Sequence, residues 1–446
     1  MAIELSTITF TNQADVVPPS GVEEILNTGI VNTLAGNDQI TGTGTEYNLI
    51  GEPTGDSTGF YNIGTGFYNI GTLNTANGND IITGIHSPSD PSNSIGLYIK
   101  SYGLINKAGT IDTGNGNDII TGISEARIND GSRNNNFGIY NYSNSTLDTG
   151  KGSDIITGRG LDFGILNYGT IYTDDGNDLI AGTSGDIYGS SLHNLGVITT
   201  GDGNDSIIGR ANGTARSAVG VFNSDTIDTG NGNDIITGIG IQAGIESYGT
   251  INTGNGNDSI IAETSLSPLF VGNVGNSIMN KGGINTGNGN DVITSTGVIY
   301  NEGVIETGNG DDSIIVDGGV DDDITGTTYG IYNNGGTINM GDGNDSIIAN
   351  EGFKSAENSS GAWFLGEGED YIKGYGSGNF YGGNGNDTLE LTPGTYTVGI
   401  WGEAGESPIF TKGDQLMITS EFEKLKAGST IYDFANLTAG QIIVVV

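Results

Sequence analysis

The sequence predicts an all-β solenoid, a right-handed parallel β-helix or β-roll in which short strands wind into stacked coils, with a small capping unit at each end. Two observations carry this prediction. A turn ending in Asp recurs along most of the 446 residues, and apolar residues, largely Ile, stand at fixed positions on either side of it. Repeats at fixed positions are typical of solenoids, whose thin core continues from coil to coil.

The composition agrees with a repeat protein. The chain has 80 Gly, a net charge of −39 and only 34% apolar residues, a mixture that is also found in disordered chains. Pro is scarce, with 8 residues, and Ile is regularly placed, so a repeated fold is the better interpretation. Only 14 Lys and Arg are present, which argues against binding to nucleic acid or to an anionic membrane surface. The natural counter-charge is a cation.

The N-terminal stretch predicts a cap over residues 1–33. It lacks the basic and apolar regions of a secretory signal peptide, and no run in the chain approaches transmembrane length. We expect a strand here, with Ile3, Leu5, Ile8 and Phe10 pointing inward. The chain has no Cys, which excludes disulfides and zinc-thiolate sites.

A repeated core defines the solenoid region, 34–391. It runs Thr113-Gly-Asn-Gly-Asn-Asp118-Ile-Ile-Thr-Gly122 and recurs identically from Thr229 to Gly238. A second element, such as Gly244-Ile-Glu-Ser-Tyr-Gly-Thr-Ile-Asn252, precedes most cores. Three short Ile-centred runs separated by Gly, Asn and Asp turns therefore make one coil of three strands, with loops inserted on one side. The cores end on Asp38, Asp80, Asp118, Asp154, Asp178, Asp205, Asp234, Asp258, Asp291, Asp312, Asp345, Asp370 and Asp387.

The repeat stops near Leu391, and residues 392–446 are expected to form a C-terminal cap. Thr395–Trp401 and Gly440–Val446 have the pattern of strands. Glu421–Ala427 is the one stretch that favours a helix. A distinct terminal unit is needed because the last coil of an open solenoid exposes unpaired backbone groups.

The chemistry of the turn points to Ca²⁺. Glycines permit positive φ and allow backbone carbonyl groups to converge, while the Asp supplies a carboxylate, and such hard oxygen ligands suit calcium. Stacked coils place equivalent aspartates about 4.8 Å apart, where each neighbouring pair would repel by about 3 kcal/mol. We therefore expect the chain to be disordered or loosely structured until millimolar calcium folds it. The alternative is that the Asn-Asp pairs only close β-turns, which both residues favour.

The turn resembles the calcium-binding nonapeptide of the RTX, or hemolysin-type, family, with the pattern G-G-x-G-x-D-x-U-x, where U is apolar. Gly382–Glu390 matches it throughout, whereas Thr113, Thr149 and Thr253 replace the first Gly in other copies. The resemblance implies metal ligation by turn carbonyls and the Asp carboxylate at the aspartates given above. The further ligating positions that it implies are Thr113, Gly114, Asn115 and Gly116 before Asp118, and Gly382 and Asn384 before Asp387.

The chain departs from that family in one respect. Its motifs occur singly and are separated by other strands, which favours one column of calcium ions, about one per gap between coils, and a wide, triangular helix in place of a flat roll. The C-terminal stretch is also similar to type I secretion substrates, which implies an extracellular or cell-surface protein that folds where calcium is high.

We expect no enzymatic activity. The chain has two His, His86 and His193, and no His-Glu-x-x-His motif. The single Gly-x-Ser-x-Gly match, Gly55–Gly59, lies in a loop-like segment and lacks the strand and helix of a nucleophile elbow. Five arginines could in principle line a polysaccharide-cleaving groove, although exposed surface positions are the simpler interpretation: Arg127, Arg133, Arg159, Arg210 and Arg216.

Two functions remain open from the sequence. The first is a structural protein that self-associates into a filament, matrix or surface layer. The second is a carbohydrate-binding or polysaccharide-modifying β-helix, in which exposed tyrosines contact an extracellular glycan. Tyrosine and asparagine ladders that stabilise the coils would explain the same residues without a glycan. The tyrosines concerned are Tyr140, Tyr142, Tyr168, Tyr172, Tyr248, Tyr329 and Tyr332.

Overall fold

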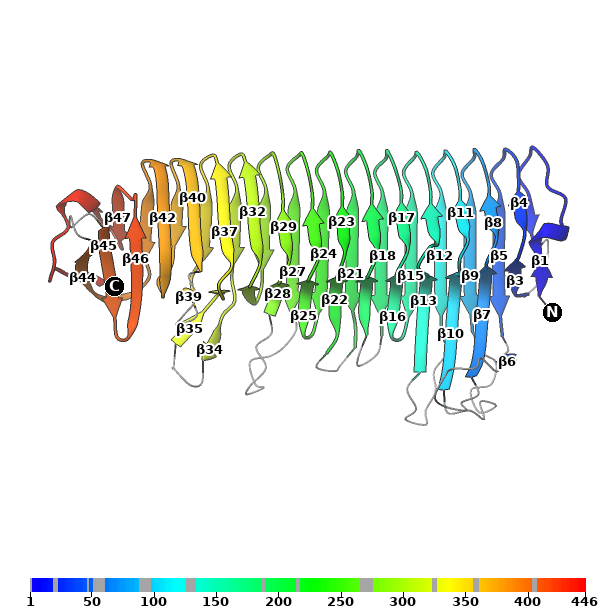
Figure 1. Cartoon of the computed structure of the whole chain (residues 1–446), viewed down its shortest axis with the longest axis horizontal. Helices are drawn as coiled ribbons and strands as arrows, with labels where there is room; N and C mark the ends of the chain where they lie inside the picture. The colour runs from blue at the N-terminus through cyan, green and yellow to red at the C-terminus, as the bar shows by residue number, and fades with distance from the viewer. Residues whose placement is uncertain are drawn as a thin grey trace. The chain divides into compact units, whose positions relative to one another are not determined.

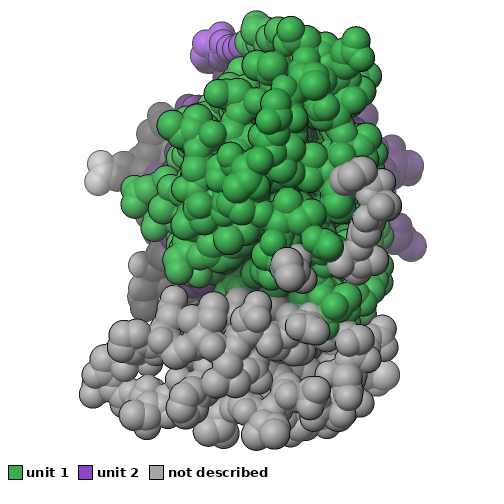
Figure 2. Space-filling model, turned by 90° about the vertical axis from the view of Figure 1, so that its right-hand side faces the viewer, with its two compact units in different colours: residues 1–231, 236–241 green, residues 232–235, 242–446 purple. Residues whose placement is uncertain are grey.

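The computed structural model describes most of the chain as two compact units, which Figure 2 colours separately. Unit 1 comprises residues 1–231 and 236–241, and unit 2 comprises residues 232–235 and 242–446. Each unit is a parallel β-helix, as the sequence predicts. The structure describes residues 2–446 except for 19–22, 46–47, 51–60, 88–97, 126–133, 186–188, 214–216, 265–275, 323–326, 356–360 and 403–406.

In unit 1 each complete coil, or rung, gives one strand to each of three parallel sheets (Figure 1). Sheet A contains β1 (Ile3–Glu4), β3 (Ile25–Asn27), β7 (Tyr61–Asn69), β10 (Tyr98–Asn106), β13 (Asn134–Asn141), β16 (Phe163–Asn167), β19 (Ser190–Asn194) and β22 (Val219–Asn223). Sheet B contains β2 (Val16–Val17), β5 (Gln39–Gly44), β9 (Ile81–His86), β12 (Ile119–Ser124), β15 (Ile155–Gly160), β18 (Leu179–Ser184) and β21 (Ser206–Ala211). Sheet C contains β4 (Ile30–Asn32), β8 (Thr72–Asn74), β11 (Thr110–Asp112), β14 (Thr146–Asp148), β17 (Thr170–Tyr172), β20 (Val197–Thr199) and β23 (Thr226–Asp228). The short strand β6 (Asn48–Ile50) pairs antiparallel with β7.

Unit 2 repeats this arrangement. Sheet A contains β25 (Ala243–Ser247), β28 (Asn276–Asn280), β31 (Val298–Asn301), β36 (Ile331–Asn333) and β39 (Phe353–Ser355). Sheet B contains β27 (Ser259–Thr264), β30 (Val292–Ser295), β33 (Ser313–Val316), β38 (Ser346–Ala349), β41 (Tyr371–Lys373), β43 (Thr388–Leu391) and β47 (Lys424–Ala427). Sheet C contains β26 (Thr250–Asn252), β29 (Gly283–Asn285), β32 (Val304–Asn309), β37 (Thr337–Asp342), β40 (Ala362–Gly368), β42 (Gly378–Gly385) and β46 (Gln415–Ser420). A hairpin of β34 (Val320–Asp322) and β35 (Thr327–Tyr329) projects from the coil, and β24 (Ile235–Gly240) is divided between the two units.

The core is a set of apolar ladders, one for each sheet. In sheet B of unit 1, Ile82 pairs in register with Ile120, and Ile120 with Ile156, and all three are completely buried. Sheet C stacks Ile111 on Leu147 in the same way. The prediction that apolar residues point inward and stack from coil to coil is therefore confirmed. Near the C-terminus the ladder becomes aromatic, with the stacked rings of Trp363 and Phe380 at a centroid distance of 4.4 Å.

A buried asparagine ladder runs beside sheet A, at the Asn of the Gly-Ile-x-Asn element. In unit 1 each side-chain amide donates to the Oδ1 atom of the next asparagine, for example over 2.8 Å from Asn141 to Asn167. Because buried amides must be hydrogen-bonded, this ladder both requires and fixes the register of successive coils. The ladder contains Asn27, Asn69, Asn106, Asn141, Asn167, Asn194 and Asn223 in unit 1, and Asn280, Asn301 and Asn333 in unit 2.

The C-terminal cap of unit 2 is built from antiparallel strands. β44 (Gly394–Trp401) pairs with β45 (Ser407–Lys412) and β49 (Ile442–Val445), β45 pairs with β46, and β47 pairs with β48 (Thr430–Asp433). A 3₁₀ turn, η3 (Phe434–Asn436), follows β48. The two strands predicted at 395–401 and 440–446 are confirmed in these positions, and the end of the last coil is covered.

Two local predictions are wrong. Glu421–Ala427 is not a helix, because its second half is β47, which pairs parallel with β43 and completes sheet B. At the N-terminus only Leu5 is buried among the four residues expected to point inward. Ile3, Ile8 and Phe10 are half-buried, and a 3₁₀ turn, η1 (Leu5–Thr7), follows β1. Among the described residues, no helix is long and apolar enough to cross a membrane.

Candidate metal centre

The repeated turn connects sheet C to sheet B, and its glycines allow the turns to stack closely. A Cβ atom on Gly116 would lie 1.4 Å from the carbonyl oxygen of Gly78 in the preceding rung. Gly114 and Gly116 also have φ values of +83° and +153°. Glycine is therefore required twice, for the positive φ that the sequence predicts and for a close approach between rungs that the sequence does not reveal.

The repeated aspartates form one continuous column in each unit. Each backbone N–H donates to the Oδ1 atom of the aspartate in the following rung, for example over 2.7 Å from Asp118 to Asp154. The structure thus brings together every predicted metal-binding aspartate within its unit. The column contains Asp38, Asp80, Asp118, Asp154, Asp178 and Asp205 in unit 1, and Asp234, Asp258, Asp291, Asp312, Asp345, Asp370 and Asp387 in unit 2.

The first aspartate of the unit 1 column and the last aspartate of the unit 2 column are hydrogen-bonded to groups outside the repeat. The N–H of Asp15 donates to Oδ1 of Asp38 over 2.8 Å, and the N–H of Asp387 donates to Oε2 of Glu423 over 2.7 Å. Glu423 was not predicted from the sequence, since it lies outside every repeat.

The second carboxylate oxygen, Oδ2, is the chemically unusual atom of the column. It is buried in nearly every rung, because the aspartates are at most 2% exposed. A buried carboxylate oxygen without a donor costs free energy, and an ion can supply the missing contact. Within the described part of the chain, Oδ2 lacks a hydrogen-bond partner in Asp80, Asp118, Asp154, Asp178, Asp258, Asp291, Asp312, Asp345, Asp370 and Asp387.

Most turns place a Thr five residues before the Asp. The Thr113 hydroxyl donates to the carbonyl oxygen of Thr149 over 3.2 Å and also lies beside the carboxylate of Asp118, where it opposes the rise in pKa that burial causes. A single hydroxyl proton cannot serve both acceptors, so the carboxylate remains undersatisfied. In the last three turns Met340, Leu365 and Gly382 occupy this position, and no hydroxyl is present there.

Burial raises the pKa of the column's carboxyl groups. The pKa of Asp154 rises to about 7, mainly because of burial, and the charges of Asp118 and Asp178 raise it further. Such groups favour a bound proton or a bound cation over bare charge. Burial raises the pKa to about 7 also in Asp178 and Asp345, and to about 6 in Asp80, Asp258, Asp312, Asp370 and Asp387.

The predicted carbonyl ligands lie at the turn beside the column. The Thr113 carbonyl accepts from the Thr75 hydroxyl over 3.3 Å, and the Asn115 carbonyl accepts from the N–H of Gly78 over 2.9 Å. The Gly114 and Gly116 carbonyls face the next turn. Among the described residues, no three His, Cys, Asp or Glu side chains cluster as a metal centre made of side chains alone would require. A cation here would therefore depend on turn carbonyls together with Oδ2, a donor set that suits Ca²⁺.

A second row of side chains also links neighbouring turns, but here the backbone N–H of a later rung donates to a side chain of the earlier rung. The residue before each Asp accepts a hydrogen bond from the backbone N–H of its counterpart in the following rung, for example from Asn117 to Asn79 over 2.9 Å. This row is exposed, whereas the Asp column is buried. Neighbouring turns are thus held by bonds that run both ways, and calcium is not needed to explain the asparagines.

Five of the seven tyrosines that suggested a glycan lie close to another of them. The ring centroids of Tyr140 and Tyr142 are 4.0 Å apart, and those of Tyr329 and Tyr332 are 5.5 Å apart. Tyr168 lies 5.8 Å from Tyr140 and is 43% exposed, and Tyr172 and Tyr248 are also exposed. The rings of Tyr140 and Tyr142 are stacked, whereas those of Tyr329 and Tyr332 meet edge to face, so these tyrosines do not form one flat aromatic platform.

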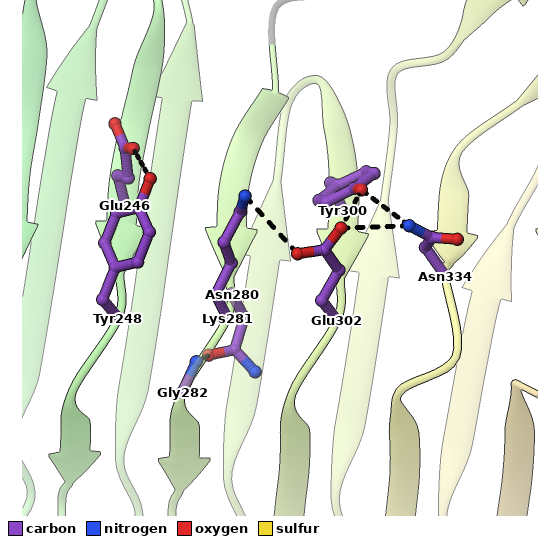
Figure 3. A network of polar contacts seen from close by, with 8 residues as sticks. All are labelled: Glu246, Tyr248, Asn280, Lys281, Gly282, Tyr300, Glu302 and Asn334. Atoms are coloured by element: carbon purple, nitrogen blue, oxygen red, sulfur yellow. Dashed lines mark hydrogen bonds and ion pairs between the residues drawn. The ribbon is translucent and has the colours of Figure 1, made fainter.

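On the outer face of unit 2, Tyr248 belongs to a polar network (Figure 3). Asn334 donates to the Tyr300 hydroxyl over 2.8 Å and to Glu302 over 3.0 Å, and Tyr300 donates to Glu302. Lys281 pairs with Glu302 over 3.4 Å, and its ammonium group lies 5.6 Å from the centroid of the Tyr248 ring. These groups satisfy one another and form a cross-rung ladder.

The histidines lie away from the column. The imidazole of His86 is completely buried, and its Nδ1 atom is 2.6 Å from the Ser101 hydroxyl. His193 stacks on Phe222 at 4.2 Å, and burial lowers its pKa to about 4, so the ring is neutral.

The arginines and the Gly-x-Ser-x-Gly match are only partly described. Arg159 lines a pocket with Glu125 and Asn212, and the lining contains no His or Tyr. Arg210 is exposed. Arg127, Arg133, Arg216 and the Gly55–Gly59 segment lie outside the described residues.

Comparisons with known proteins add little. No family model matches the chain, and no curated protein matches its sequence. Among solved structures, the chain is similar to a hyperactive, Ca²⁺-dependent, β-helical antifreeze protein from an Antarctic bacterium, with 18% identity, 96% of each chain covered and a TM-score of 0.36. A TM-score this low does not establish a shared fold, so the β-helix rests on the strand pairing described above.

Proposed function

We propose that the chain is a calcium-binding structural protein that folds outside the cell and forms part of a surface layer, matrix or filament. The observation that supports this most directly is the buried column of aspartates, in which Oδ2 of Asp118, Asp154 and most of the others has no hydrogen-bond partner among the described residues and burial raises the pKa of the carboxyl group in most rungs. A divalent cation in each gap would supply the missing contacts and neutralise the stacked charge.

The residues that would hold calcium are those of the turn. Oδ2 of successive aspartates and the carbonyl oxygens of the glycine-containing turn supply the ligands, and Oδ1 stays committed to the backbone of the preceding rung. Calcium would contribute electrostatic stabilisation and no chemistry of its own. The chain's own hydrogen bonds set the spacing at which the carboxylates stand.

The test is a calcium titration of the chelator-treated protein, followed by circular dichroism and by calorimetric stoichiometry. We expect a cooperative gain of β-structure with several ions bound per chain. A folded β-spectrum in chelator at neutral pH, with no heat of calcium binding, would overturn the proposal.

The same property fits export by a type I route. The chain carries a net charge of −39, and stacked carboxylates oppose folding wherever calcium is low. Submicromolar calcium inside a cell would keep the chain extended for passage, and millimolar calcium outside would fold it. Secretion from a bacterial host with and without the C-terminal residues 392–446 tests the location of the signal.

Self-association is supported by one surface in unit 1 that carries no acidic side chain, which we call the B-face. It consists of the outward side chains of β9, β12, β15 and β18, and none of them is Asp or Glu. These side chains are Ile81, Thr83, Ile85, Ile119, Thr121, Ile123, Ile155, Thr157, Arg159, Leu179, Ala181 and Thr183.

A second copy of the chain is the partner that this surface fits. Two chains of charge −39 repel each other wherever acidic groups meet, and the B-face is a flat apolar area without such groups. Two B-faces can pack as two sheets do in a sandwich.

Sedimentation of calcium-loaded protein tests the pairing. We expect Thr121→Glu to abolish association and Thr110→Glu, on the outer side of sheet C, to leave it intact. Wild-type protein that stays monomeric at high concentration would contradict self-association through this surface.

A further inference from the structure

The C-terminal cap imitates a turn of the repeat. β46 pairs with β42 and β47 pairs with β43, both in parallel, so the segment between them, 421–423, stands above the last turn, 382–387. Glu421 takes the left-handed φ of +61° that the turn glycines supply elsewhere. The cap therefore continues the column with three residues where a complete turn uses six.

Glu423 takes the place of the next aspartate. Its Oε2 accepts the N–H of Asp387 over 2.7 Å, as Oδ1 of each aspartate does for the rung before it. The carbonyl oxygen of Asp387 in turn accepts from the N–H groups of Glu423 and Lys424 at 3.2 and 2.9 Å. The longer glutamate side chain thus reaches back to the column from the shortened cap segment. Glu423 as a residue is exposed, unlike the aspartates.

The last turn also lacks the hydroxyl that accompanies most other aspartates, because Gly382 stands where most turns have Thr. Two acceptor oxygens converge on the space beside this glycine. A Cβ atom on Gly382 would lie 1.9 Å from the Glu421 carbonyl oxygen and 2.9 Å from Oδ2 of Asp387. Oδ2 of Asp387 is completely buried and has no hydrogen-bond partner among the described residues.

Negative charge gathers at the same point. Burial raises the pKa of Asp387 to about 6, and the charges of Glu423, Glu369 and Glu421 raise it further. A cluster of acidic side chains alone would be an ordinary solvated surface. Here it lies beside a buried carboxylate oxygen without a hydrogen-bond partner among the described residues, and a second acceptor oxygen lies close to the same glycine, which is an arrangement that a cation satisfies.

We propose that Asp387, the Glu421 carbonyl and the Glu423 carboxylate form a terminal calcium site, and that Gly382 allows the Glu421 carbonyl to come close to the last turn. The site rests on the proposed calcium-dependent fold and adds to it a ligand from the cap. Because Glu423 is exposed, water completes the coordination, and this ion exchanges faster than ions held between two buried aspartates.

Glu423→Gln tests the site. The amide oxygen can still accept the N–H of Asp387, so the cap keeps its hydrogen bond and only the charge is lost. Glu369→Gln is the matched control, because it removes another charge near Asp387 and alters none of the proposed ligands. Calcium stoichiometry by calorimetry and the calcium-induced rise in Tm are the readouts, with circular dichroism in excess calcium confirming that each variant folds.

We expect Glu423→Gln to bind about one ion fewer than the wild type and to gain less Tm from calcium, whereas Glu369→Gln keeps the wild-type stoichiometry. An unchanged stoichiometry and Tm rise in Glu423→Gln would overturn the terminal site while leaving the proposed function in place. A wild-type chain that binds no calcium would overturn both.

Discussion

The turns of this protein fall into two groups that support the same aspartate column differently. Where Thr precedes the Asp by five residues, as at Thr113 or Thr286, a hydroxyl lies beside the carboxylate and links to the next rung. In the last three turns Met340, Leu365 and Gly382 remove that hydroxyl, and the nearby core becomes aromatic with Trp363 and Phe380. In both groups the backbone N–H groups are the main hydrogen-bond donors to the aspartates, and in both groups Oδ2 is undersatisfied.

Calcium removal should have the largest effect. In chelator at neutral pH, both groups of turns retain stacked carboxylates without counter-charge, so we expect most of the β-structure to be lost. Circular dichroism with and without chelator measures this. If the Thr-containing turns alone remain protected in hydrogen exchange, the hydroxyl contributes more than we infer.

The pH dependence of stability should have opposite directions in chelator and in excess calcium. Folded-state pKa values of about 6 to 7 in Asp154, Asp345 and Asp387 exceed the ordinary value of about 3.9. The calcium-free folded state therefore binds more protons than the unfolded chain, and its unfolding free energy falls as pH rises from about 4 to 7.

In chelator we expect the protein to be more stable at pH 5 than at pH 8, with a thermal unfolding transition at pH 5 and none at pH 8, where the chain is already unfolded. In excess calcium the order should invert, because calcium requires ionised carboxylates. Thermal melts at both pH values decide the matter, and the same order with and without calcium would contradict a shared site for protons and calcium.

The effect of a single Asp178→Asn substitution on the unfolding free energy should have opposite signs with and without calcium. The amide keeps an oxygen for the N–H of Asp154 and removes one charge from the column. In chelator we expect a gain of roughly 1 to 3 kcal/mol, and in calcium a loss of similar size together with a lower stoichiometry. The β-structure that remains in chelator, followed by circular dichroism, measures the first effect, and a denaturant melt in calcium measures the second. Destabilisation in both conditions would show that the aspartate acts only through its hydrogen bond.

The smallest effect concerns the hydroxyl itself. Thr286→Val removes a donor that reaches the Thr307 carbonyl over 3.1 Å, and it makes this turn resemble the one at Leu365. We expect a loss of about 1 kcal/mol in unfolding free energy. Thr294→Val, on the outer face of the same rung, should cost much less. Equal values for the two variants would remove the distinction between the two groups of turns.

Much of the fold could be predicted from the sequence because the Asp turn recurs about once per coil and marks where each coil begins and ends. One Asp turn per coil, three strands per coil and inward-pointing apolar residues all follow from the spacing. The segment Glu421–Ala427 could not be predicted correctly, since Glu, Lys and Leu favour helices and only pairing with β43 makes part of it a strand. Glu423 escaped notice for the same reason.

The chemistry of the column was partly visible. The sequence predicts that the aspartates lie together, and the structure places them together in each unit. The sequence cannot show that Oδ1 accepts a backbone N–H while Oδ2 has no donor, because both oxygen atoms belong to the same side chain. The recurrent Thr five residues before the Asp was the available clue to the hydroxyl, and its replacement at Met340 and Leu365 the clue to a second kind of turn.

The paired bonds between turns have a consequence for how such a gene can change. Most interior rungs give one N–H forward to an Asp, as from Asp118 to Asp154, and one N–H back to the side chain that precedes the Asp of the rung before, as from Asn117 to Asn79. Inserting or deleting one whole rung leaves every remaining rung with the same neighbours on both sides. Unequal recombination between repeats can therefore lengthen or shorten the protein in single steps without passing through a misfolded intermediate, provided that the segments around Asp15 and Glu423 are inherited intact.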